Sequence, residues 1–167
     1  MKSFAAFLIS TMLAGAVHAA TPTPDASQVK AAHDLMASMQ AEKMMRMTAG
    51  MSQYASPAQR KEVMDKVIKL DPEMVYTRLA TPVAKLLSTE TSLEMTKFYQ
   101  SSYGKKILQS TYNSGASFGP STPKPTAAEQ AELKKPAYVK ASKEFKANEQ
   151  AINHETFVLL KSVINGK

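Results

Sequence analysis

The chain has 167 residues, with 21 basic and 14 acidic side chains, a formal net charge of +7 and no cysteine. Without cysteine there is no disulfide framework and no thiol chemistry. The basic residues are spread along the chain rather than clustered, so we expect no nucleic-acid partner. The length allows one domain with a hydrophobic core of its own.

The first 19 residues are typical of a secretory signal peptide. Lys2 gives a positive start, and the apolar run from Phe4 to Val17 is too short to span a bilayer. Val17 and Ala19 suit cleavage after Ala19. We therefore expect a soluble periplasmic or secreted protein of a Gram-negative type bacterium, with no membrane span after cleavage. A retained N-terminal anchor is the alternative.

A helix is predicted from residue 26 to about residue 50, after a short disordered lead at 20–25. Asp25 or Ser27 can cap the start of this helix, and Gln28, three residues after Asp25, would complete a capping box with it. Glu42 and Arg46 have the spacing of an ion pair on the solvent side. The apolar stripe of this helix consists of Val29, Ala32, Met36, Met39 and Met47.

Methionines are concentrated in and just after this helix, and three hypotheses compete for them. Flexible thioether side chains fill irregular helical cores well, and the stripe favours that interpretation. They also suit a partner-binding groove, and soft sulfur ligands select Cu(I) or Ag(I), with His33 as a possible helper. Met45 points away from the stripe and has no explanation in it. The candidate metal ligands are Met44, Met45, Met47 and Met51.

Two further helices are predicted at 57–70 and 72–87. Ser56-Pro57 and Asp71-Pro72 each place a capping side chain directly before a proline at the first helical position. Pro82 lacks an N–H and crowds the preceding turn, so we expect it to kink or split the second of these helices.

The most specific stretch of the chain lies between residues 88 and 112. Ser88 or Thr89 is expected to cap a fourth helix, and Ser101 a fifth one that ends near residue 112. Gly104 falls in the first turn of that fifth helix, where glycine costs about 1 kcal/mol relative to alanine. We expect this glycine to admit a close backbone approach, with Phe98 and its neighbouring tyrosine filling the corner between the helices.

The run F-Y-Q-S-S-Y-G-K-K-I-L, residues 98–108, resembles the signature F-Y-x-S-P-x-G-x-K-hydrophobic of the DUF2059 family of exported bacterial proteins. Ser102 stands where the family prefers proline. The resemblance implies an all-helical periplasmic domain and no particular reaction, since the family's activity is unassigned. The matching positions are Phe98, Tyr99, Ser101, Gly104 and Lys106.

A loop rich in small residues and proline is predicted at 113–125. Thr126 and Glu129 then form a capping box for another helix, which is expected to be stopped or kinked at Pro136. A long last helix is expected from about Tyr138 or Ser142 to Asn165. A shift of 38 residues aligns 88–108 with 126–146, which would fit a duplicated helical hairpin. Chance similarity between amphipathic helices would produce the same alignment.

Signatures of hydrolases, nucleotide-binding loops and dinucleotide-binding folds are missing from the sequence. His33 and His154 are far apart, so a zinc site would need the fold to bring them together with carboxylates. We assign no catalytic residue and no cofactor. An unrecognised hydrolase stays open as an alternative, if His154 meets carboxylates in a cleft.

The sequence thus predicts an all-α, single compact domain at 26–167, made of helical hairpins with six to seven helices. The leading function hypothesis is a non-enzymatic cell-envelope protein that binds a protein or another envelope component. Cu(I) or Ag(I) handling is the alternative from another class. The groove for a partner is expected to involve some of Met44, Met45, Met51, Tyr99 and Tyr103.

Overall fold

The computed structural model describes residues 23–113 and 122–166. The predicted signal peptide at 1–19, its cleavage near Ala19, the first part of the lead at 20–25 and most of the loop at 113–125 lie outside these residues. Residues 23–25 have no regular secondary structure.

Regular structure within the described residues is entirely α-helical, as predicted. One helix more than the predicted maximum is present, because the first predicted helix is divided in two. The eight helices are α1 (Ala26–Ser38), α2 (Ala41–Met51), α3 (Pro57–Ile68), α4 (Pro72–Leu86), α5 (Thr89–Gln100), α6 (Ser102–Asn113), α7 (Ala127–Leu133) and α8 (Pro136–Ile164).

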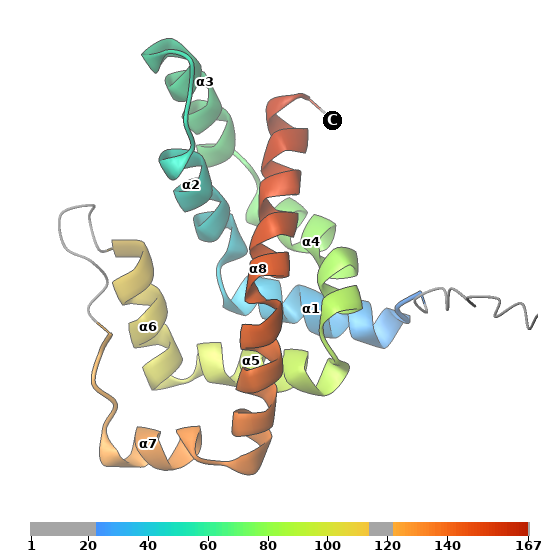
Figure 1. The fold of residues 1–167 in the computed structure, drawn as a ribbon, viewed down its shortest axis with the longest axis vertical. Coiled ribbons are helices and arrows are strands. Elements are labelled where there is room, and N and C mark those ends of the chain that lie inside the picture. Colours follow the sequence, from blue (N-terminus) through green and yellow to red (C-terminus); the bar gives the residue numbers. More distant parts are fainter. Residues whose placement is uncertain (1–22, 114–121, 167) are drawn as a thin grey trace, which may run out of the picture.

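The long helix α8 runs through the length of the molecule, and the other helices are arranged around it (Figure 1). Helix α1 packs against α4 and α5, and α8 packs on α4 and α5 as well, which forms one compact domain. Helices α2 and α3 lie at one end, beside the C-terminal half of α8. Helices α6 and α7 lie toward the other end, where α7 leads into the start of α8 (Figure 1).

The division between α1 and α2 occurs at Gln40, which has a φ of 57° in the left-handed region. One residue in this conformation interrupts the helical phase, so the stripe predicted for a continuous helix does not persist beyond it. Met45 is fully buried, whereas Met47 is 37% exposed. The predicted core position of Met47 is therefore wrong, and the break explains why Met45 faces the interior.

The same change of phase turns Glu42 inward. It was predicted on the solvent side, but it is 8% exposed and accepts a hydrogen bond of 2.6 Å from the Tyr76 hydroxyl of α4. Burial, followed by the hydrogen bond to Glu42, raises the pKa of Tyr76 above its ordinary value. The carboxylate therefore links α2 to α4 rather than facing water.

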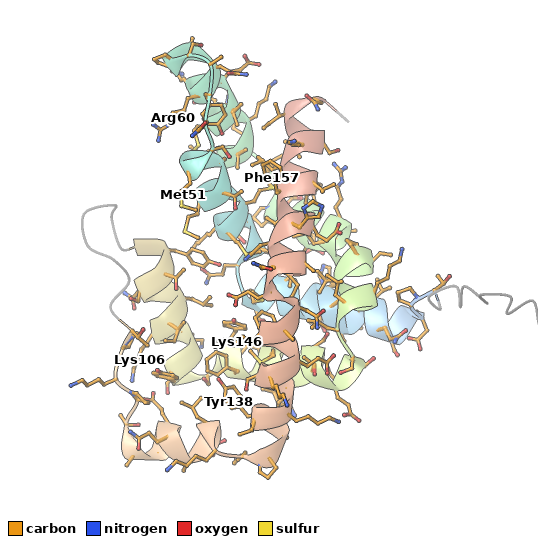
Figure 2. All side chains as sticks on the ribbon, in the orientation of Figure 1. Met51, Arg60, Lys106, Tyr138, Lys146 and Phe157 are labelled. Atoms are coloured by element: carbon orange, nitrogen blue, oxygen red, sulfur yellow. The ribbon has the colours of Figure 1, made fainter. Side chains whose placement is uncertain are left out.

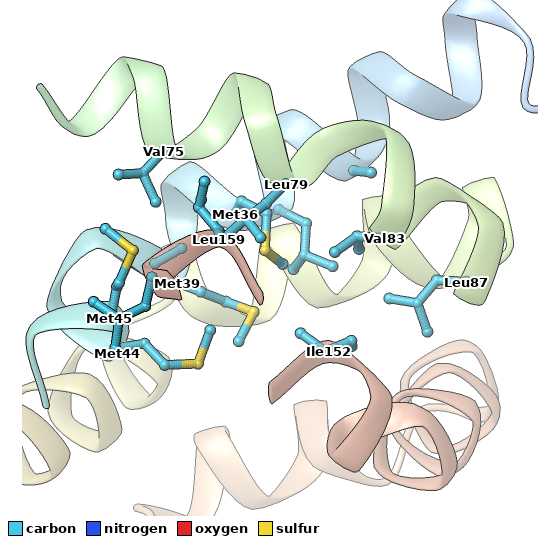
Figure 3. Packing of buried hydrophobic residues seen from close by; sticks show 14 of the residues in the cluster. Met36, Met39, Met44, Met45, Val75, Leu79, Val83, Leu87, Ile152 and Leu159 are labelled. Atoms are coloured by element: carbon cyan, nitrogen blue, oxygen red, sulfur yellow. The ribbon is translucent and has the colours of Figure 1, made fainter. Parts of the chain in front are cut away.

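The hydrophobic core joins methionines of α1 and α2 to aliphatic side chains of α4 and α8 (Figure 3). Burying one such side chain contributes about 1.5–3 kcal/mol to folding. The methionine-rich segment is thus mainly core. Its members in the cluster include Met36, Met39, Met44 and Met45, packed with Val75, Leu79, Val83, Ile152 and Leu159.

The predicted helix caps are confirmed wherever the signal was a short polar side chain. Their side-chain oxygens accept hydrogen bonds from backbone N–H groups in the first turn, which satisfies donors that have no partner inside the helix. Helix α4 continues through Pro82 instead of splitting there. The confirmed caps are Asp25, Ser56, Asp71, Ser88 and Thr126.

No helix in the described ranges combines the length and the apolar character that crossing a membrane requires.

Candidate functional site

Ser101 forms the corner between α5 and α6. Its backbone N–H donates to the carbonyls of Lys97 and Phe98, both at 3.0 Å, which ends α5. Its side-chain oxygen accepts from the Gly104 N–H at 3.1 Å, which caps α6, and its hydroxyl donates to the Phe98 carbonyl at 2.6 Å. One serine therefore closes one helix and opens the next, as predicted.

Gly104 lies where the first turn of α6 meets the last turn of α5. A Cβ atom placed on it would lie 2.0 Å from the Phe98 carbonyl oxygen and 2.7 Å from the Cα of Tyr99. Both obstacles are backbone atoms, which cannot move aside as a flexible side chain does. The predicted close backbone approach is confirmed, and it fixes the angle between the two helices.

The Phe98 and Tyr99 rings pack edge-on against each other in this corner, with their centroids 5.0 Å apart. The Tyr99 ring packs edge-on against Phe145 of α8, with centroids 6.2 Å apart, and burial raises the pKa of its hydroxyl. The Phe98 ring lies 5.1 Å from Tyr138 and 6.3 Å from Tyr103. Tyr99 therefore secures the corner to the core, and Phe98 forms an aromatic group with Tyr103 and Tyr138.

The aromatic group of Phe98, Tyr103 and Tyr138 lines a cleft of about 450 Å³ between α5, α6, α7 and the start of α8. Figure 2 shows Tyr138 at the start of α8 and Lys106 on the neighbouring α6. The apolar walls of the cleft are Phe98, Tyr103, Leu133 and Tyr138, and its charged lining includes Glu94, Lys97, Glu132 and Lys135.

These charged side chains form two pairs of opposite sign, each between residues three positions apart in the sequence. Lys97 lies 3.1 Å from Glu94, and Lys135 lies 2.6 Å from Glu132. Exposed pairs of this kind contribute little to stability. The lining of the cleft therefore carries positive and negative charges in alternation, and it has no strong electrostatic field of one sign.

Glu129 lies at the boundary of the cleft and connects α7 to α6. Its Oε1 accepts from the Ser102 hydroxyl at 2.6 Å and from the Lys106 ammonium at 2.9 Å, while its Oε2 accepts from the Thr126 N–H at 2.8 Å. The bond from Ser102 first, then those from Thr126 and Lys106, lowers the pKa of Glu129 to about 2.

The capping box signal predicted the local half of this arrangement and missed the bonds from α6. Ser102, which departs from the family pattern, supplies a hydroxyl that proline would lack. Lys106, one of the matching positions, makes an ion pair with Glu129 across 23 residues of sequence. No sequence spacing relates these two residues to Glu129.

The predicted groove residues are divided between the core and the surface. Met44 and Met45 are buried in the core, and Met51 is 72% exposed at the end of α2. Tyr103 lines the cleft, and Tyr99 packs against α8. The four candidate metal ligands are divided in the same way, because Met47, like Met51, is exposed.

The two histidines within the described residues lie in different environments. His33 Nε2 is 2.7 Å from Glu73 Oε1, and its Nδ1 is 3.4 Å from Asp34 Oδ1. His154 is exposed on α8. Within residues 23–113 and 122–166, no group of three or more histidine, aspartate or glutamate side chains could hold a metal ion.

A second hollow of about 510 Å³ lies between α3 and the C-terminal end of α8. It is lined by Tyr54, Val63 and Phe157, and the Lys161 ammonium lies 4.7 Å from the centre of the Phe157 ring. The first cleft is the stronger candidate, because it draws residues from four helices and contains the corner motif.

Comparisons with protein-family models, with curated proteins and with solved structures find no match to this chain.

Proposed function

We propose that this chain is a non-enzymatic protein of the cell envelope, and that its cleft receives apolar side chains from a protein partner. The observation that carries this proposal is the composition of the cleft. Phe98, Tyr103 and Tyr138 give it aromatic walls, and charges of both signs surround them. An apolar centre within a mixed polar rim is the common anatomy of protein interfaces.

The charges and the volume both favour a protein segment over other occupants. A nucleic acid or an anionic lipid surface would be matched by a uniformly basic lining, whereas Lys97 and Lys135 are each paired with a glutamate. A volume of about 450 Å³ accommodates a few side chains. The cleft therefore suits an anchoring segment, since a few buried residues carry most of the affinity of an interface.

The envelope location rests on the predicted signal peptide, and membership of the DUF2059 family rests on the resemblance of residues 98–108. Cell fractionation followed by N-terminal sequencing tests the location. We expect an exported chain that begins at Ala20. An uncleaved chain recovered from the cytoplasm would refute this part of the proposal.

Photocrosslinking in intact cells tests the cleft. Benzoylphenylalanine in place of Tyr103 is expected to give a discrete protein adduct. The same group in place of Val158, which is exposed on α8 outside the cleft, is expected to give none. Ala128→Trp fills the cleft from α7 and should abolish the adduct. Ala131→Trp is the matched control, because Ala131 is exposed on the same helix and is not part of the cleft lining.

The proposal is contradicted if Tyr103 gives no protein adduct, if Val158 gives an equal adduct, or if the adduct survives Ala128→Trp. A lipid adduct without a protein adduct would also contradict it, because it would show a different class of partner.

Handling of Cu(I) or Ag(I) is the second candidate, and one observation favours it. Met47 and Met51 are both exposed and are four residues apart on α2, which places their sulfur atoms on the same side of the helix. Competition with a Cu(I) indicator tests this candidate. Binding that persists unchanged in Met47→Leu with Met51→Leu would end it, and loss of binding would support it.

A further inference from the structure

Helix α7 is attached to the rest of the molecule by few contacts. It contains no fully buried residue, and only Glu129 and Leu133 among its seven residues are partly shielded from solvent. Leu133 points into the cleft, where it forms part of the apolar wall. The neighbouring helices α5 and α8 instead bury several side chains each in the core.

A helix of this length is not stable by itself. Nucleating a helix is costly, and isolated helices shorter than about 12 residues are marginal in water. The seven residues of α7 must therefore obtain their order from the cap at Thr126 and from docking on the surrounding helices. Docking and folding of α7 are thus expected to be coupled.

Glu129 provides that coupling through its two carboxylate oxygens. Oε2 completes the capping box on the Thr126 N–H, and it also lies 3.2 Å from the Lys106 ammonium. Oε1 accepts from Ser102 and Lys106 of α6. The carboxylate that completes the capping box of α7 is therefore the same group that holds α7 on α6.

The chain on the C-terminal side of α7 allows the helix to move as a unit. After Leu133 the chain passes through Lys134 and the extended residue Lys135 before Pro136 begins α8. The first buried residue of α8 is Ala141, so the core holds α8 from that point onward. On the N-terminal side, the Tyr103 hydroxyl donates to the Pro123 carbonyl at 3.0 Å, which is a second tether.

We propose that α7 is a lid on the aromatic cleft, which unfolds and detaches as one unit when the bonds from Ser102 and Lys106 to Glu129 break. Opening exposes Phe98, Tyr103 and Tyr138 to a partner segment, which takes the place of Leu133. The proposal that this opening controls partner binding in the cleft rests on the proposed function. The opening itself is a property of the free chain, and it is measured without a partner.

Hydrogen exchange of the purified chain tests the lid directly. Glu129→Ala removes the carboxylate half of the capping box and the docking bonds, and we expect the α7 amides to exchange roughly tenfold faster or more, with α5 and the core part of α8 unchanged. Lys106→Met removes a docking bond and leaves the cap intact. If docking and folding of α7 are coupled, Lys106→Met must also accelerate amide exchange in α7, although Lys106 lies on α6.

Lys105→Met is the matched control, because Lys105 is exposed on α6 next to Lys106 and the pairing with Glu129 is made by Lys106. It should leave α7 unchanged. The lid is refuted if Glu129→Ala does not accelerate exchange in α7, or if Lys106→Met behaves like Lys105→Met. It is also refuted if α5 and α8 open together with α7, since the unit would then be the whole fold.

A thiol probe supplies a second measurement that does not depend on amide exchange. The chain has no cysteine, so Leu133→Cys introduces a single reactive group inside the cleft. Its reaction with a maleimide should be faster with Glu129→Ala and unchanged with Lys105→Met. An unchanged rate with Glu129→Ala would overturn the lid. If the lid opens but crosslinking at Tyr103 finds no protein, only the proposed function is refuted.

Discussion

Helices α5 and α7 begin in the same way and differ in how firmly the rest of the fold holds them. Each has a hydroxyl side chain as its cap, Ser88 or Thr126, and each receives help from a glutamate. For α7 that glutamate is its own Glu129, whereas for α5 it is Glu144 of α8, which accepts from the Ser88 N–H at 2.6 Å and from the Thr91 hydroxyl at 2.7 Å. The cap therefore marks where a helix begins, and packing decides its stability.

The lengths of the two helices show the same contrast. Helices α5 and α7 start 38 residues apart, as the predicted internal repeat requires, but α5 has 12 residues and α7 has seven. Their successors differ more, with 12 residues in α6 and 29 in α8. A shared origin of the two hairpins stays a prediction, and their present roles are different.

The largest expected difference between the helices concerns their apolar side chains. Met95 of α5 is 3% exposed in the core, so Met95→Ala should lower the free energy of unfolding by about 3 kcal/mol. Leu133 of α7 is half-buried, and Leu133→Ala should cost less than about 1 kcal/mol. Urea denaturation measures both, and equal losses would mean that α7 is as firmly packed as α5.

Glycine substitutions sharpen the role of the corner between α5 and α6. Gly104→Ala brings a Cβ against the Phe98 carbonyl and should destabilise the fold by about 2 kcal/mol, and Gly104→Leu by more. Gly50→Ala is the control, because a Cβ there meets nothing within 4 Å, and it should stabilise the protein by up to about 1 kcal/mol. A thermal melt of Gly104→Ala that matches the wild type would show that the corner can open freely.

The Glu144 cap is expected to have a smaller effect. Glu144→Gln keeps the shape of the side chain but weakens its bonds to the start of α5, so unfolding should become easier by about 1 kcal/mol. Chemical denaturation at neutral pH measures this change. No change at all would indicate that the Ser88 hydroxyl alone caps α5.

Acidification provides the smallest and most selective comparison. Burial raises the pKa of Glu144, but the bonds from Ser88 and Thr91 outweigh it, and the pKa lies below the ordinary value of 4.5. The ionised group therefore stabilises the fold above pH 4.5, and this contribution is lost as the pH falls through the lowered pKa.

The wild type should accordingly lose more stability than Glu144→Gln between neutral pH and a pH below 4.5. Urea midpoints at the two pH values give the difference. Parallel losses in the two proteins would show that other carboxylates account for the acid sensitivity.

The parts of this fold that sequence predicts are those fixed by neighbours along the chain. Caps depend on side chains two or three residues away, and Ser56, Asp71 and Thr126 were identified for that reason. The break at Gln40 was missed, because glutamine is not a residue that favours the left-handed region. One unexpected φ angle then misplaced the faces of α2.

The candidate site was predictable only in part, for the same reason. The corner motif, with Ser101 and Gly104, was found from its local spacing, and the structure confirms its geometry. The cleft depends on where α7 lies relative to α5 and α8. The bonds that place α7 join Glu129 to residues 23 and 27 positions earlier, which no periodic pattern encodes.

The burial of Met36, Met39 and Met45 also has a chemical consequence. Oxidation turns a thioether into a polar sulfoxide, which a close-packed core cannot accommodate. Met51, 72% exposed, is open to oxidants in the folded state, while the core sulfurs are reached only when the fold opens. Exposure to peroxide therefore converts brief opening into lasting damage, and the resistance of this protein to oxidants follows its conformational stability.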